Sequence, residues 1–157
     1  MSKFEGKKAP AFKLLDQNGE THELSDYKGQ VVVVYFYPKD STPGCTLEAQ
    51  QFRNNMKKFK SMGVQILGIS KDSVESHYRF ADKQNLNFPI LSDESRKVVE
   101  KYDVLIEKSM FGKSYMGVSR QSFLIDKTGK VVKHYENVKP KEHFEEILKD
   151  IRDLELA

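Results

Sequence analysis

The 157-residue sequence has a single cysteine and lacks any long apolar run. One cysteine excludes an intramolecular disulfide and a zinc site built from several thiolates. The longest apolar run, residues 31–37, is far shorter than the roughly 20 residues of a membrane-spanning helix. Residues 1–8 also lack the apolar stretch of a secretory signal peptide. We therefore expect a cytoplasmic protein that does not act in a membrane.

An excess of charge of one sign is also missing. The 26 Lys and Arg residues are interleaved with 23 Asp and Glu residues, which gives no broad basic surface for nucleic acid. The densest basic stretch, residues 57–60, falls in an expected helix and is interpreted as its solvated face. Repeats and low-complexity linkers are missing as well, so we expect one domain over residues 1–157.

Residue groupings typical of metal or phosphate binding do not occur in the sequence. The four histidines, His22, His77, His134 and His143, stand far apart without the spacing of metal ligands. No glycine-rich phosphate loop and no nucleophilic serine elbow is present. We expect no metal site and no cofactor.

Short apolar stretches alternate with segments of helical spacing along the chain. We expect strands at 11–15, 21–24, 31–37, 64–69, 88–91, 121–126 and 131–135. We expect helices from Pro43 until Gly63, at 72–84 with Val74, Tyr78 and Ala81 inward, at 94–102, and from Pro140 onward. The central run 31–37 does not alternate, which is typical of a strand buried on both faces.

The lone cysteine lies in a proline-bracketed loop that follows this buried strand. Pro43 suits the first position of a helix, and Thr42 is then its expected N-cap. Cys45 would lie in the first helical turn, where free backbone N–H groups and the helix dipole favour a thiolate. A strand, a loop and a helix that begins with a reactive residue indicate an α/β, thioredoxin-like fold: a central mixed sheet flanked by helices, with an N-terminal hairpin.

The same loop carries a family resemblance. Pro38, Thr42 and Cys45 match the Pro-x-x-x-Thr-x-x-Cys motif of the peroxiredoxins. Segments 35–39 (YFYPK) and 42–46 (TPGCT), with Glu48, are similar to the branch called bacterioferritin comigratory protein or peroxiredoxin Q. The similarity continues through 67–70 (LGIS), 91–93 (LSD), 112–113 (GK) and 123–126 (FLID), and so covers nearly the whole chain.

The resemblance implies a thiol-specific peroxidase of antioxidant defence that reduces hydrogen peroxide and organic hydroperoxides. Cys45 resembles the peroxidatic cysteine, which becomes a sulfenic acid. Thr42 matches the threonine that binds peroxide and the thiolate, and Pro38 matches the proline that shields the site from water. Arg120 matches the arginine that holds the thiolate and polarises the peroxide. Fixed donors at these places would stabilise the charge that develops in the transition state.

Each of these residues also has a plain structural interpretation. Thr42 could only cap the helix, Pro38 could only end the strand, and Arg120 could be a surface arginine before a strand. Glu48 could orient Arg120 or a loop amide, or could be a charge on the helix surface. The joint pattern favours the catalytic interpretation.

The sequence departs from the family where many members carry a resolving cysteine. Gln50 stands five residues after Cys45, and residues 97–102 lack the cysteine of other relatives. A Cys45 sulfenic acid must therefore be reduced by an external thiol. Thioredoxin, or glutaredoxin with glutathione, are the expected reductants, with a second copy of the chain as a further option. The resemblance implies a monomer or weak dimer.

Two other functions remain open on the sequence. A thioredoxin-like thiol–disulfide exchange protein would use the Thr42-x-x-Cys45 spacing, although Arg120 stands where such proteins place a cis-proline. A binding domain would hold Cys45 as an inert buried residue. The segment containing Met110, Phe111, Tyr115 and Met116 is expected to be a long loop with one or two of these residues in the core. Lining the mouth of the active site and forming a partner surface are the alternatives for this loop.

Overall fold

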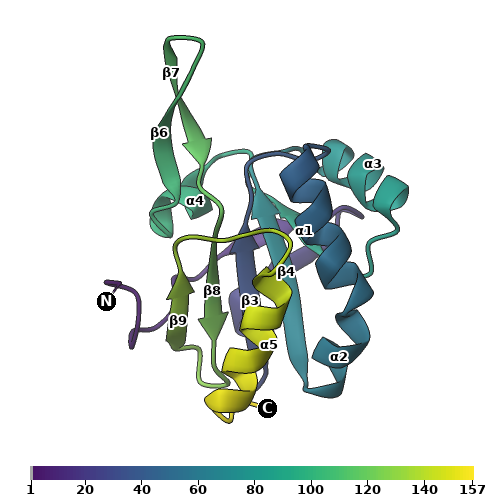
Figure 1. The fold of residues 1–157 in the computed structure, drawn as a ribbon, viewed down its shortest axis with the longest axis vertical. Coiled ribbons are helices and arrows are strands. Elements are labelled where there is room, and N and C mark those ends of the chain that lie inside the picture. Colours follow the sequence, from purple (N-terminus) through teal and green to yellow (C-terminus); the bar gives the residue numbers. More distant parts are fainter. Residues whose placement is uncertain (1) are drawn as a thin grey trace.

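The computed structural model describes residues 2–157, and its centre is a mixed sheet (Figure 1). Seven strands pair in the order β2-β1-β5-β4-β3-β8-β9, and β6 and β7 form a separate hairpin. The strands are β1 (Lys13–Leu15), β2 (Thr21–Glu23), β3 (Val31–Phe36), β4 (Val64–Ser70), β5 (Ile90–Ser92), β6 (Leu105–Met110), β7 (Lys113–Val118), β8 (Gln121–Ile125) and β9 (Val131–Tyr135). The helices are η1 (Leu24–Tyr27), α1 (Pro43–Asn54), α2 (Met56–Ser61), α3 (Val74–Gln84), α4 (Lys97–Lys101) and α5 (His143–Asp153).

Strand β3 lies in the middle of the sheet, as its unbroken apolar sequence predicts. All six of its residues are buried. It runs parallel to β4 and antiparallel to β8, with Phe36 opposite Gln121. The sheet is therefore mixed, and the predicted thioredoxin-like class with its N-terminal β1–β2 hairpin is confirmed.

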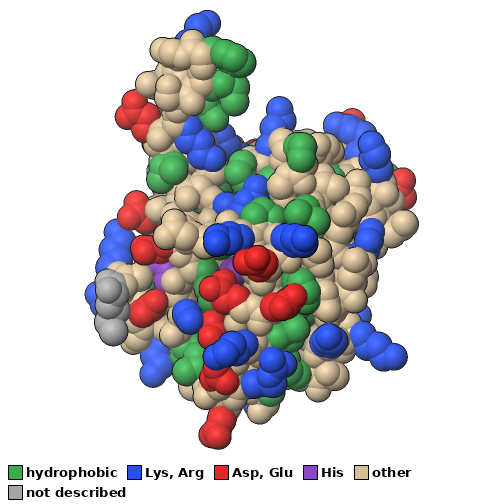
Figure 2. Space-filling model, viewed as in Figure 1, with side chains coloured by type: hydrophobic (Ala, Val, Ile, Leu, Met, Phe, Trp, Pro, Cys, Tyr) green, Lys and Arg blue, Asp and Glu red, His purple; other side chains and the backbone are tan. Residues whose placement is uncertain are grey.

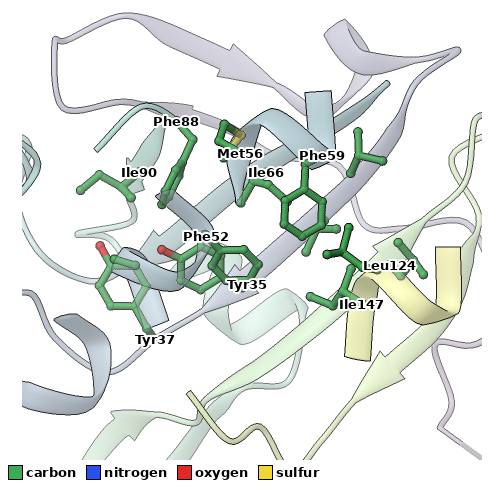
Figure 3. Packing of buried hydrophobic residues seen from close by; sticks show 14 of the residues in the cluster. Tyr35, Tyr37, Phe52, Met56, Phe59, Ile66, Phe88, Ile90, Leu124 and Ile147 are labelled. Atoms are coloured by element: carbon green, nitrogen blue, oxygen red, sulfur yellow. The ribbon is translucent and has the colours of Figure 1, made fainter. Parts of the chain in front are cut away.

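The two faces of β3 belong to two separate cores. Val31, Val33 and Tyr35 face a core that includes residues of α1, α2, α3 and α5. Val32, Val34 and Phe36 face a second core with α4 and the N-terminal segment. In the first core the rings of Tyr35 and Phe52 stack with centroids 4.7 Å apart (Figure 3). This stacking fixes α1, which carries Cys45 in its first turn, against the end of β3.

The long helix expected from Pro43 to Gly63 is two helices. The Asn55 side-chain Nδ2 donates to the backbone carbonyl of Gln51, and this local hydrogen bond competes with a continuous helix. In α3, Ala81 is buried as predicted, but Tyr78 is not. Tyr78 is 56% exposed, whereas His77 and Phe80 are buried, because the His77 ring bonds to Asp40 and to the Leu91 carbonyl.

Two further helix starts differ from the prediction. Helix α4 begins at Lys97 rather than at residue 94, because Arg96 before it takes a left-handed conformation with φ 64°. Helix α5 begins at His143 rather than at Pro140. No helix within residues 2–157 has the length and apolar character needed to cross a membrane.

The segment expected to be a loop around residue 111 is the β6–β7 hairpin, which projects from the body of the protein (Figure 1). The prediction that part of it packs in the core was wrong. Met110, Phe111, Tyr115 and Met116 are all exposed, Phe111 at 97%. The two strands pair with each other and not with the seven-stranded sheet. Figure 2 shows hydrophobic side chains gathered on one side of the projecting hairpin.

Candidate active site

The candidate site lies where β3 ends and α1 begins. Thr42 is the N-cap residue by its backbone conformation, and Pro43 takes the first helical position, as predicted. The Thr42 side chain accepts no capping hydrogen bond, and its hydroxyl donates to the Lys39 carbonyl at 2.8 Å. Pro38 is half-buried between β3 and this loop. The hydroxyl of Thr42 makes no hydrogen bond to Cys45 in the part of the chain that the structure describes.

Cys45 is the third residue of α1 and is only 2% exposed. The Nη2 of Arg120 donates to its Sγ at 3.4 Å. The sheet register explains this contact between distant residues. Because Phe36 at the end of β3 pairs with Gln121 at the start of β8, Arg120 lies beside the loop that leads to Cys45. The cysteine is thus buried at the edge of the first core, and its sulfur also contacts a cation.

Arg120 also binds the buried carboxylate of Glu48, one turn after Cys45 in α1. Its Nη1 donates to Glu48 Oε1 at 2.7 Å. Burial raises the pKa of Glu48 to about 7, although the charge and hydrogen bond of Arg120 oppose this rise. Burial lowers the pKa of Arg120, but Glu48 and Cys45 raise it by more, so its positive charge is retained. Of the roles that the sequence leaves open for Glu48, the structure shows the contact with Arg120.

Gly44 leaves the space that the guanidinium of Arg120 occupies. A Cβ at this position would lie 2.9 Å from Arg120 Nη2 and 3.8 Å from Pro140 Cγ. The first distance is too short for a stable contact, so a larger residue would push the guanidinium away from Sγ. The helix start and the arginine therefore fit together only when this residue has no side chain.

We expect a Gly44→Ala variant to lose roughly tenfold to a hundredfold in kcat/KM for peroxide, because a displaced guanidinium no longer holds the sulfur. Steady-state peroxide consumption with dithiothreitol as reductant measures this loss. Ser61→Ala, which shortens an exposed side chain at the end of α2, is a suitable control. Equal activity of Gly44→Ala and the wild type would contradict a positioning role for this contact.

A second polar network, which the sequence interpretation missed, is centred on Asp40 in the loop that precedes Cys45. The Asp40 carboxylate accepts hydrogen bonds from Tyr37 at 2.7 Å and Ser76 at 2.8 Å, and lies 2.6 Å from His77 Nδ1. The Asp40 amide donates to Asp72. One signal was available: His77 lies three residues before Phe80, on the apolar face of α3. The network ties the loop before Cys45 to α3 and to the end of β4.

Two groups of acids and histidines come close enough to offer ligands to one metal ion. They are Asp16, Glu20 and His22, and Asp40, Asp72 and His77, with ligand atoms within 4.8 Å of one another. In the first group, His22 Nε2 already lies 2.7 Å from Asp16. In the second, the Asp72 carboxylate accepts from Ser70 at 2.6 Å. These hydrogen bonds give both groups a structural role, and neither contacts Cys45.

Comparison with known proteins gives consistent matches. Residues 6–134 match the model of the AhpC/TSA family. Peroxiredoxin Bcp of Bacillus subtilis (strain 168) is 48% identical over 149 residues, which is 95% of each chain. Peroxiredoxin Bcp of Escherichia coli (strain K12) is 48% identical over 145 residues, covering 92% of this chain and 93% of that protein. The structure of the Xanthomonas campestris bacterioferritin comigratory protein superposes with a TM-score of 0.86 at 38% identity, over 91% of both chains.

Proposed function

The chain belongs to the AhpC/TSA family and is a peroxiredoxin, a thiol-dependent peroxidase, and we propose that Cys45 is the residue at which it reduces peroxide. One observation carries this assignment. Cys45 is the chain's single cysteine, and it lies at a helix start with the guanidinium of Arg120 on its sulfur. A thiolate is favoured in that place by the cation, the helix dipole and the free N–H groups of the first turn.

In the proposed step the thiolate sulfur of Cys45 attacks one peroxide oxygen. An S–O bond forms, the O–O bond breaks, and the sulfur is oxidised to a sulfenic acid while the peroxide is reduced to an alcohol or water. Arg120 stabilises the charge shared by the sulfur and the leaving oxygen. We assign to the Thr42 hydroxyl the binding of the peroxide, and to Pro38 the exclusion of water from the thiolate.

For the substrate we propose hydrogen peroxide and organic hydroperoxides. The X. campestris relative is described by its alkyl peroxide reduction activity, which supports the second class. The reacting atoms in both classes are the same two oxygens, so the contacts proposed for Arg120 and Thr42 serve either substrate.

An external thiol must complete the cycle, because the chain has no second cysteine. Gln50, five residues after Cys45, donates to Gln84 of α3 at 2.9 Å and so links the two helices. We propose a thioredoxin as the reductant, with glutaredoxin and glutathione as the alternative, and a monomer or weak dimer. The reductant's thiol attacks the sulfenic sulfur and releases water, and a second thiol then resolves the mixed disulfide.

Mass spectrometry after one equivalent of peroxide tests the proposal. We expect a sulfenic acid on Cys45, which a dimedone probe traps. We expect no trapped product when reduced thioredoxin is added before the probe. Peroxide left unconsumed and an unmodified Cys45 would overturn the assignment. Faster reduction of a protein disulfide than of peroxide would instead favour thiol–disulfide exchange.

A further inference from the structure

One guanidinium serves two acidic side chains in this site. Arg120 donates through Nη2 to Cys45 Sγ at 3.4 Å and through Nη1 to Glu48 Oε1 at 2.7 Å. Both acids belong to the first turns of α1 and both are buried, Cys45 at 2% and Glu48 at 1% exposure. Two anions that share one cation disfavour each other, so the ionisation of Glu48 depends on the charge of Cys45.

The surroundings of Glu48 suit a neutral carboxylic acid better than a carboxylate. An ionised carboxylate offers about four acceptor sites, but within residues 2–157 Glu48 Oε2 has no hydrogen-bond partner. The buried Tyr35 hydroxyl on β3 is likewise without a partner in the same range. A buried carboxylate that accepts from only one donor group, here Arg120 Nη1, is costly in free energy. A bound proton removes most of that cost.

Three other ionisable side chains lie around the site, Tyr35, His143 and Lys108, and each pKa shift favours the neutral form. The exchange of charge is therefore confined to Arg120, Cys45 and Glu48. Burial raises the pKa of Tyr35 well above its usual value, and Glu48, Cys45 and Asp40 raise it further, so Tyr35 stays neutral. Burial lowers the pKa of His143 on α5, next to Arg120. Burial also lowers the pKa of Lys108 on β6, and Arg120 lowers it further.

We propose that Glu48 stores the proton that peroxide reduction at Cys45 consumes. The inference rests on the proposed function of Cys45. The balanced step joins a Cys45 thiolate, a protonated Glu48 and a hydroperoxide, and it yields a Cys45 sulfenic acid, an ionised Glu48 and an alcohol. The S–O bond forms and the O–O bond breaks. The alkoxide takes up one proton, Glu48 gives up one, and the site carries one negative charge before and after.

The change of charge on sulfur drives the release. While Cys45 is a thiolate, it takes part of the guanidinium's charge and repels a second anion, so Glu48 keeps its proton. A sulfenic acid is neutral, and Arg120 then pairs with Glu48 alone. An unshared cation favours the ionised carboxylate, so the pKa of Glu48 falls back to the value of about 7 that burial and Arg120 set without the thiolate. Glu48 therefore acts through Arg120 as a positioning and proton-storing residue, without touching the peroxide.

Proton uptake during a single oxidation tests this coupling. Reduced protein in weakly buffered solution with a pH indicator is mixed with one equivalent of hydrogen peroxide, and mass spectrometry counts the sulfenic acid formed. At pH 7 and up to about one unit above it, we expect the wild type to take up about half a proton less per Cys45 than Glu48→Gln, because the pKa of Glu48 is about 7 without the thiolate and higher beside it. About two units below pH 7 the difference should vanish, because Glu48 is then protonated in both states.

Two controls separate this outcome from a structural effect. Glu145→Gln, which changes an exposed carboxylate of α5, should match the wild type at every pH. Difference infrared spectra of the wild type alone should lose a protonated carboxyl band when Cys45 is oxidised, which keeps the test valid if Glu48→Gln folds poorly. Equal uptake by wild type and Glu48→Gln, or an unchanged carboxyl band, would overturn the proposal. A wild type that forms no sulfenic acid would instead overturn the function of Cys45.

Discussion

Cys45→Ser is expected to reduce peroxide at no more than the uncatalysed background rate while keeping the wild-type fold. Serine has nearly the shape of cysteine, so the buried place in α1 is kept filled. Its hydroxyl is far less acidic than a thiol, and Arg120 at 3.4 Å does not supply enough stabilisation to ionise it at neutral pH. Peroxide consumption with dithiothreitol measures the activity, and circular dichroism measures the fold.

A second variant separates the site from the mere presence of a thiol. Cys45→Ser combined with Ser61→Cys places the chain's one thiol at the exposed end of α2. That thiol has neither the helix start nor the guanidinium beside it. We expect the double variant to stay at background, and recovered peroxidase activity would show that the surroundings of Cys45 contribute little.

The cysteine loop was predictable because its signals are local. An apolar run that ends at a proline, and a second proline that starts a helix, place Cys45 in the first turn of α1 without any long-range information. The family resemblance then added Arg120. What the loop sequence does not contain is the pairing of Phe36 with Gln121, which brings that arginine to the sulfur across 75 positions of sequence.

The residues that sequence interpretation left open or placed wrongly are those whose surroundings come from distant parts of the chain. Glu48 follows Cys45 in a helix where a surface charge is equally reasonable, and its burial depends on an ion pair with Arg120, which immediately precedes β8. Tyr78 has the spacing of an inward residue, but the bond between His77 and Asp40 turns a different face of α3 inward. Helical periodicity alone does not distinguish these faces, since a buried polar pair outweighs one aromatic residue.

Arg120→Met is the substitution with the next largest expected effect. Methionine fills much of the same space but removes the donors to Cys45 and Glu48 together. We expect kcat/KM for peroxide to fall about 100- to 1,000-fold, as is typical when a preorganised donor to the transition state is lost. The remaining helix dipole and first-turn N–H groups should keep the rate of sulfenic acid formation above that of Cys45→Ser. Stopped-flow measurement of Cys45 oxidation gives both rates.

Arg120→Lys decides which property of the arginine matters. Lysine keeps the positive charge but has a single terminal nitrogen, so it does not reproduce the fork that reaches Cys45 through Nη2 and Glu48 through Nη1. If charge alone sustained the rate, Arg120→Lys would react like the wild type. We expect Arg120→Lys to retain only a small part of the wild-type activity. The sulfur and the carboxylate are held one helical turn apart, and one ammonium does not donate to both as the guanidinium does. Recovery of the full rate would show that the two-pronged contact is not needed for peroxide reduction.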